Sequence, residues 1–197
     1  MRVGFRRTQE GAAGTVRPQS GFSAWLGVAA FGLILAATRP AGAQTPAASD
    51  GLRTEPSYLE LSAGVWDIIG NAHRNEAGAA GAEFRFGRKL FHIGPAAGLL
   101  ADWHGGGMVY AGFYGDIRLG PIVVTPLAGL GLWWRGGDND EELGGPFEFR
   151  LSLETAYQFA DRSRLGLRFG HISNADTRRK NPGENDLMLG YALPLDF

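Results

Sequence analysis

The sequence predicts an all-β protein: an eight-stranded antiparallel transmembrane β-barrel of the outer-membrane type. Two observations predict this fold. Apolar and polar residues alternate along eight segments, and a period of two is typical of strands whose faces meet different surroundings. Glycine is abundant, with 31 residues, and segments with helical periodicity are hard to find. Both features favour β-structure over helices.

The expected strands begin at Tyr58 and are joined alternately by long and short connections. Gly120-Pro121 and residues 160–163 are expected to be tight turns, whereas residues 67–78 and 135–146 are expected to be loops. The approximate strand ranges are 58–65, 80–86, 93–103, 108–119, 122–134, 147–159, 164–171 and 187–197.

The alternation assigns two faces to most of these strands. It is clearest in residues 147–159, where aromatic residues and leucines oppose Glu148, Arg150 and Glu154. The faces of residues 122–134 stay unassigned, because nearly every residue there is apolar. Two placements compete: a soluble lipid-binding barrel has its apolar face inside, and a transmembrane barrel has it outside.

Three features favour the transmembrane placement. The strands have about 10 residues, as a tilted membrane-spanning strand requires. Tryptophans fall at the ends of odd-numbered strands, where they would form an aromatic girdle at one rim: Trp66, Trp103, Trp133 and Trp134. The chain also ends on Phe197 after alternating aromatic and apolar residues, as bacterial outer-membrane barrels do.

The N-terminal region predicts export. Basic residues precede an apolar run over residues 22–37, and Ala41-Gly42-Ala43 follows, which are the parts of a cleaved signal peptide. A membrane anchor is the alternative, but the run is shorter than the roughly 20 residues that a spanning helix needs. We therefore expect a signal peptide over residues 1–43, a flexible lead-in over 44–57 and the barrel over 58–197.

Composition narrows the class of partner. Without the five arginines and one glutamate of residues 1–43, the chain's 19 basic and 20 acidic residues fall to 14 and 19. This mildly acidic balance gives no nucleic-acid surface, which needs clustered basic residues. There are no cysteines, so an exported chain must be held by its core or by a closed sheet. The sequence leaves the oligomeric state open, and a homodimer is one option.

One unusual pair lies at the end of the seventh strand. His171 and Ser173 are two residues apart, so in a strand they share a face and stand roughly 7 Å apart at Cα. Leu165, Leu167 and Phe169 share that face. With both chain ends on the periplasmic side, this strand places the pair at the external rim, on the lipid-facing wall. An imidazole beside a serine is the minimum pair for an activated nucleophile.

The surrounding residues resemble a known family. His171-Ile172-Ser173-Asn174-Ala175, followed by Asn181-Pro182-Gly183-Glu184 and a final apolar strand, is similar to the PagL-type lipid A 3-O-deacylases. The resemblance implies an eight-stranded outer-membrane barrel and a serine esterase acting on lipopolysaccharide. The expected reaction is hydrolysis of the 3-O-linked acyl ester of lipid A in the outer leaflet, releasing a 3-hydroxy fatty acid.

The resemblance also implies roles for individual residues. Ser173 is expected to be the nucleophile, His171 the general base, and Asn174 an oxyanion donor. A carboxylate should orient His171. We expect this to be Glu184, although strict alternation puts Asn185 on the outward face, and Asp186 is a third option. Glu184 reaches the histidine only if the chain bulges between Gly183 and Leu187.

The remaining polar residues predict no cofactor and no metal site. His73, His92 and His104 are scattered along the chain. An acidic loop that could attract a divalent ion bound to lipopolysaccharide is expected instead to be solvated: Asp138, Asp140, Glu141 and Glu142. A non-enzymatic structural or adhesive barrel is the rival function, since it shares every feature except the histidine, serine and asparagine cluster.

Overall fold

The computed structural model describes residues 51–69, 76–137 and 140–195, and these form strands, turns and loops. No helix among those residues is long and apolar enough to cross a membrane. The expected signal peptide lies outside the described residues, as do residues 44–50 of the lead-in, His73 and Asp138.

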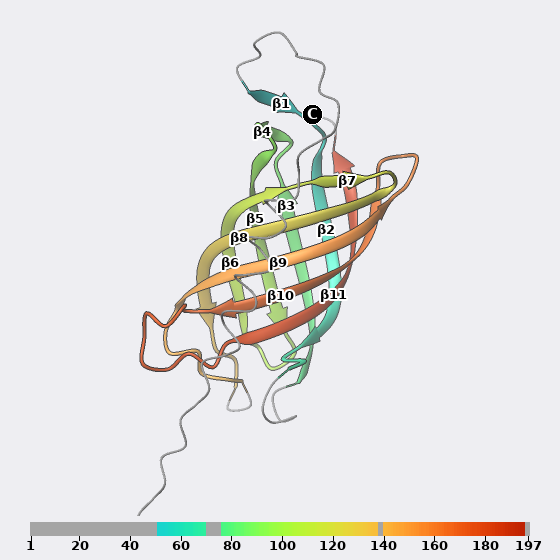
Figure 1. Ribbon diagram of the computed structural model, residues 1–197. Coiled ribbons are helices and arrows are strands. Elements are labelled where there is room, and N and C mark those ends of the chain that lie inside the picture. The colour runs from blue at the N-terminus through green and yellow to red at the C-terminus, as the bar shows by residue number, and fades with distance from the viewer. Residues whose placement is uncertain (1–50, 70–75, 138–139, 196–197) are drawn as a thin grey trace, which may run out of the picture.

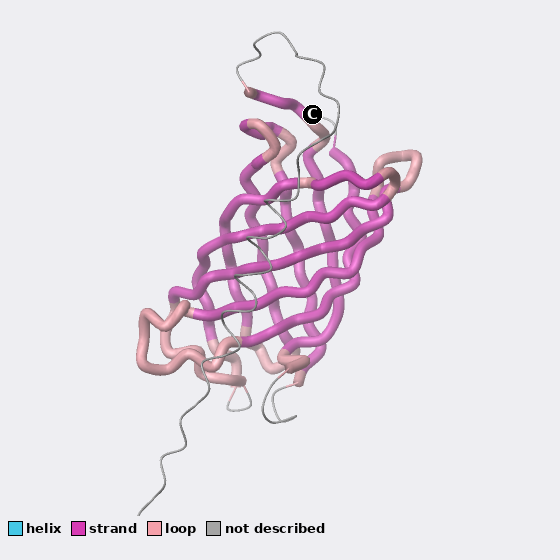
Figure 2. The backbone as a smooth tube through the Cα atoms, in the orientation of Figure 1, coloured by secondary structure: helices cyan, strands magenta, loops and turns pink. Residues whose placement is uncertain are grey.

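Eight strands close into one antiparallel barrel (Figures 1 and 2). Each wall strand pairs with its neighbour in the chain, and β11 pairs with β2 to close the ring. The wall strands are β2 (Ser57–Trp66), β3 (Ala77–Arg85), β5 (Ile93–Asp102), β6 (Gly107–Gly115), β8 (Ile122–Trp134), β9 (Phe147–Gln158), β10 (Arg164–Ser173) and β11 (Glu184–Leu195).

Three short strands lie at the end of the barrel that carries the described chain ends: β1 (Leu52–Thr54), β4 (Arg88–Leu90) and β7 (Ile117–Leu119). β1 pairs with β4 and β7 pairs with β8. Within the lead-in expected over residues 44–57, Leu52–Thr54 thus form a short strand, because β4 offers the free edge of a short hairpin to pair with.

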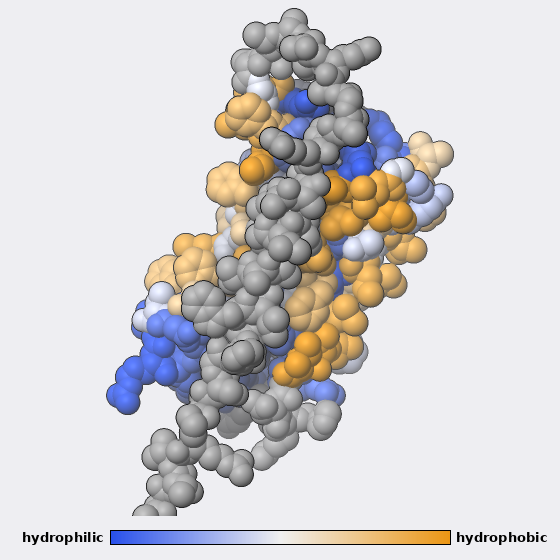
Figure 3. Space-filling view, in the orientation of Figure 1, coloured by the Kyte–Doolittle hydropathy of each residue, from blue (hydrophilic) through white to orange (hydrophobic). Residues whose placement is uncertain are grey.

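The apolar side chains of the barrel wall point outward. Leu61 is 56% exposed and Phe113 is 64% exposed, whereas Glu60 and Arg85 are each 1% exposed. Figure 3 shows hydrophobic side chains covering the visible wall between more hydrophilic ends. This arrangement confirms the transmembrane barrel and rules out the soluble lipid-binding barrel, whose apolar residues would fill the interior.

Buried charges fill the interior and pair with one another. Arg85 contacts Glu60, Glu83 and Glu154, and Arg168 lies 2.6 Å from Glu60 and 2.9 Å from Glu83. Two cations are thus shared among three carboxylates contributed by three strands. Such a network satisfies the buried charges and leaves the centre of an eight-stranded barrel filled by side chains, not open as a pore.

Removing one member of this network should be costly. We expect Arg168→Met to lower the free energy of unfolding by about 3–5 kcal/mol, because Glu60 and Glu83 would keep buried charge without a full set of partners. Urea unfolding of the barrel in detergent measures the change. Arg118→Met is the matched control, since Arg118 is 41% exposed in its pair with Glu55 and should contribute about 0–1 kcal/mol. Equal losses in both variants would contradict a stabilising interior network.

The expected aromatic girdle is only half present. Trp103 is 83% exposed and Trp134 is 40% exposed, as a girdle requires. Trp66 and Trp133 instead point inward, are at most 5% exposed, and stack with ring centroids 5.5 Å apart. The prediction was wrong for these two because both share the interior face of their strands, and position at a strand end does not override that period.

Candidate active site

β10 carries His171 and Ser173 to the end of the barrel opposite the described chain ends (Figure 1). The strand runs through Ser173, two residues beyond its expected end, because it stays paired with β9 as far as Ser173 and Phe149. Both side chains are half-buried on the outward face, while Ile172 between them is fully buried. The sequence prediction that they share the lipid-facing wall is confirmed geometrically.

The partner of His171 is Asn185. The two residues are directly opposite in the β10–β11 register, and His171 Nδ1 lies 2.8 Å from Asn185 Oδ1. An amide oxygen only accepts hydrogen bonds, so the hydrogen of the neutral imidazole belongs on Nδ1. That leaves Nε2 with a free lone pair, which is the state a general base needs.

Glu184 does not lie beside His171, so the expectation that it orients the histidine is corrected. The β10–β11 pairing is regular from Arg164 to Ile172, without the bulge that Glu184 would need. Glu184 is 1% exposed and lies inside the barrel. Asp186 also points inward, where it pairs with Arg150. Strict alternation along β11 therefore predicts correctly that Asn185 is the residue beside His171.

Asn174 has a different role from the expected one. Its side-chain nitrogen donates to the carbonyls of Leu143 (2.7 Å) and Lys180 (2.8 Å), and its backbone N–H donates to Asn181 Oδ1 (3.0 Å). These N–H groups of Asn174 therefore bind other parts of the protein, and the side chain is fully buried on the inner side, where it does not face the outward wall as an oxyanion donor would. Asn174 ties the loop after Ser173 (residues 174–183) to the loop 135–146.

Gly183 shapes the space beside the imidazole. Its φ is +68°, and a Cβ at this position would lie 2.9 Å from His171 Cε1 and 3.4 Å from Nε2. The Asn-Pro-Gly sequence therefore does more than turn the chain, because its glycine lets the loop pass close to the proposed base.

We expect Gly183→Ala to lower the rate of ester hydrolysis by on the order of 10–100-fold, since displacing a reacting group by about 1 Å has effects of this size. Gly120→Ala is the matched control. Gly120 has a similar φ of +64°, and a Cβ there has nothing within 4 Å, so backbone strain is retained without contact to the imidazole. Equal activity losses in both variants would show that strain alone, and not the contact with His171, is responsible.

Apolar side chains surround the pair on the outward wall. Phe149, Phe169 and Leu187 are each more than a third exposed, and their strand positions adjoin His171 and Ser173. These residues present a hydrocarbon-like surface immediately beside the nucleophile candidate. The arrangement suits a substrate whose ester joins a polar head to an acyl chain within the membrane.

Comparison with known proteins concerns the family and the fold. The family model described as lipid A 3-O-deacylase (PagL) matches residues 58–194. No curated protein sequence matches the chain. The crystal structure of the outer membrane enzyme PagL is 18% identical, with a TM-score of 0.55, covering 70% of this chain and 99% of that chain. A structure from the de novo design of transmembrane beta-barrels is 11% identical, with a TM-score of 0.47, over 72% and 98% of the two chains.

The family match covers nearly the whole barrel and includes the strands β10 and β11, which carry His171, Ser173 and Asn185. The similarity to the PagL crystal structure independently supports the fold. The chain therefore belongs to the lipid A 3-O-deacylase (PagL) family and has the barrel fold of an outer-membrane enzyme.

Proposed function

We propose that this protein is a serine esterase that hydrolyses the 3-O-linked acyl ester of lipid A and releases a 3-hydroxy fatty acid. The observation that carries the proposal is the hydrogen bond from His171 Nδ1 to Asn185 Oδ1, which leaves Nε2 available on the wall that also bears Ser173. The family match supports lipid A as the substrate class.

In the proposed reaction, His171 Nε2 takes the proton of the Ser173 hydroxyl as Oγ attacks the ester carbonyl. The bond between the carbonyl carbon and the lipid A oxygen then breaks, and Nε2 returns the proton to that oxygen. A water molecule next attacks the acyl-serine, again with His171 as base. This second step releases the fatty acid and restores Ser173.

The placement of the pair accounts for access to the substrate. We infer that signal-directed export delivers the chain to the outer membrane, with the chain ends facing the periplasm and Ser173 in the outer leaflet. Lipopolysaccharide then reaches the serine by lateral diffusion, and its acyl chains lie against the apolar wall near Phe149 and Phe169. The substrate needs no extraction from the bilayer.

Mass spectrometry of lipid A tests the proposal. Cells producing the protein should contain lipid A that lacks one 3-hydroxyacyl chain, together with free 3-hydroxy fatty acid. Cells producing an equal amount of folded Ser173→Ala protein should keep intact lipid A. Intact lipid A in both strains, with both proteins folded in the outer membrane, would favour the non-enzymatic structural or adhesive barrel.

A further inference from the structure

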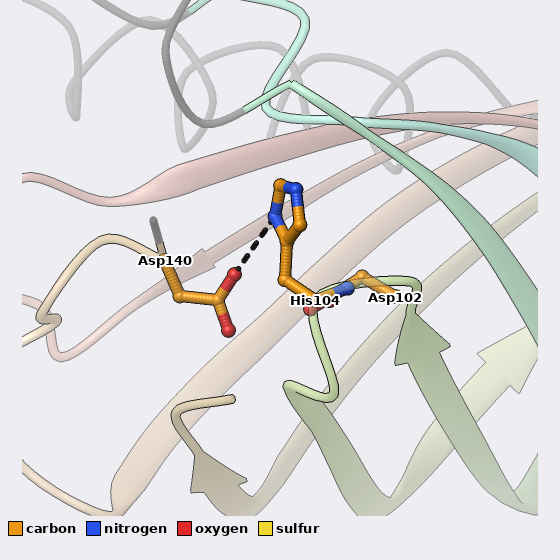
Figure 4. Close-up of side chains that lie close together, drawn as sticks. All are labelled: Asp102, His104 and Asp140. Atoms are coloured by element: carbon orange, nitrogen blue, oxygen red, sulfur yellow. Dashed lines mark hydrogen bonds and ion pairs between the residues drawn. The ribbon is translucent and has the colours of Figure 1, made fainter. Parts of the chain in front are cut away.

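Two loops meet at the same end of the barrel as Ser173. Residues 103–106 connect β5 to β6, and residues 135–146 connect β8 to β9; Trp134 Nε1 donates to the carbonyl of Gly105 at 3.1 Å. The loops bring together Asp102, His104 and Asp140, whose nearest ligand atoms all lie within 4.8 Å of one another. Figure 4 shows the His104 ring facing the Asp140 carboxylate, and their closest atoms are 3.2 Å apart.

Each carboxylate is held by backbone amides on one of its oxygens. Asp102 Oδ1 accepts hydrogen bonds from the N–H groups of His104 (2.6 Å) and Gly106 (3.2 Å), and Asp140 Oδ2 accepts one from Gly136 (2.6 Å). Asp102 is 93% buried, yet its Oδ2 has no hydrogen-bond partner. A buried carboxylate oxygen without a partner is costly and indicates a missing ligand.

Gly106 shows where that oxygen points. A Cβ on Gly106 would lie 2.5 Å from Asp102 Oδ2 and 2.3 Å from Asp140 Oδ2. The two carboxylates thus converge on one small space, and the glycine keeps it open. The buried oxygen of Asp102 is therefore directed into the cluster and not toward solvent.

Further acidic side chains lie near the cluster. Asp140 and Asp102 both interact electrostatically with Glu184, which is buried inside the barrel nearby. In the loop after β2, burial and the neighbouring Glu141 and Glu76 raise the pKa of Asp67. A divalent cation bound between Asp102 and Asp140 would stabilise the charged form of these carboxylates.

We propose that Asp102, His104 and Asp140 bind one divalent transition-metal ion of the Zn²⁺ type. Imidazole together with carboxylates suits zinc, whereas Ca²⁺ and Mg²⁺ favour oxygen ligands throughout. Ligands about 2.1 Å from an ion lie about 3.4–4.2 Å apart, so the widest separation must shorten by about 1 Å. Small rotations of the three ligand side chains would supply this movement, and His104, whose side chain is 27% exposed, has room to turn.

The ion would clamp two loops next to the candidate active site. Residue 140 precedes Leu143, whose carbonyl accepts the hydrogen bond from Asn174 immediately after Ser173. The metal site is separate from the hydrolytic residues and needs no part of the proposed esterase chemistry. Sequence spacing predicts no such site, because its ligands come from the end of β5, the loop that follows it and the loop 135–146, which meet only in the closed barrel.

The proposal is tested by measuring zinc binding to the full barrel. The protein is folded in detergent without lipopolysaccharide, and a chelator removes any bound metal beforehand. Titration calorimetry and atomic spectroscopy should show one Zn²⁺ per chain. His104→Ala and Asp102→Asn should weaken binding on the order of 100-fold or more, since loss of an outer-shell partner alone costs about 10–100-fold. Asp102→Asn retains Oδ1, so the turn at residues 102–106 keeps its two N–H acceptor contacts.

Gly106→Ala provides a further test that keeps all three ligands. Its methyl group would enter the space between the carboxylates, so zinc binding should be lost while heat-modifiable migration still reports a folded barrel. Glu142→Gln, in the loop that carries Asp140, and His92→Ala, in an exposed turn, should bind zinc as the unmodified protein does. Absent stoichiometric zinc, a preference for Ca²⁺, or equal losses in the control variants would overturn the proposal.

Discussion

Ser173→Ala and His171→Ala are each expected to abolish deacylation of lipopolysaccharide while leaving the barrel folded. Loss of a nucleophile or its base in a hydrolytic triad lowers kcat by on the order of 10⁴–10⁶-fold. Both side chains lie on the outward wall, so neither substitution disturbs the interior ion network around Arg85 and Arg168. Release of 3-hydroxy fatty acid from purified lipopolysaccharide in detergent measures the loss.

A fluorophosphonate probe separates the two roles. The probe should label the unmodified protein at Ser173, should fail on Ser173→Ala, and should react much more slowly with His171→Ala because the base is missing. Leu165→Ala is the control. Leu165 lies on the same face of β10 but at the other end of the strand, so the probe should label this variant as it labels the unmodified protein. An active Ser173→Ala protein would overturn the serine-esterase proposal.

Asn185→Ala is expected to lower kcat by on the order of 100-fold or more, because the imidazole loses the hydrogen bond that fixes Nδ1. Asn185→Asp, which has the same shape, should instead raise kcat by about 10-fold. A carboxylate stabilises the imidazolium formed during the reaction, and charge-assisted hydrogen bonds are roughly twice as strong as neutral ones. Side-by-side assays on lipopolysaccharide measure both changes.

Glu184→Gln provides the contrast to these variants. Because Glu184 lies inside the barrel beside other acidic residues, the neutral amide should leave kcat nearly unchanged and should not lower the stability of the barrel. Strong loss of activity in Glu184→Gln, with Asn185→Ala still active, would invert the ranking and show that the carboxylate reaches the histidine during catalysis.

Alternation in the sequence predicted the barrel well, because the side-chain period of a strand is fixed by backbone geometry. The same rule, applied strictly, places Asn185 outward and Trp66 inward, as the structure has them. The expectations for Trp66 and Glu184 were wrong because each departed from this period. Trp66 was assigned to the girdle from its position at a strand end. Glu184 was chosen because a carboxylate is preferred beside a histidine.

The sequence by itself determined the number of wall strands, the apolar face of most of them and the shared face of His171 and Ser173. Each of these depends on local periodicity, which neighbouring residues encode. Only the tertiary structure decided which residue meets His171, where the donors of Asn174 go, and that Asp102, His104 and Asp140 converge. These contacts join segments far apart in the chain, and the register between strands and the closure of the barrel set their distances.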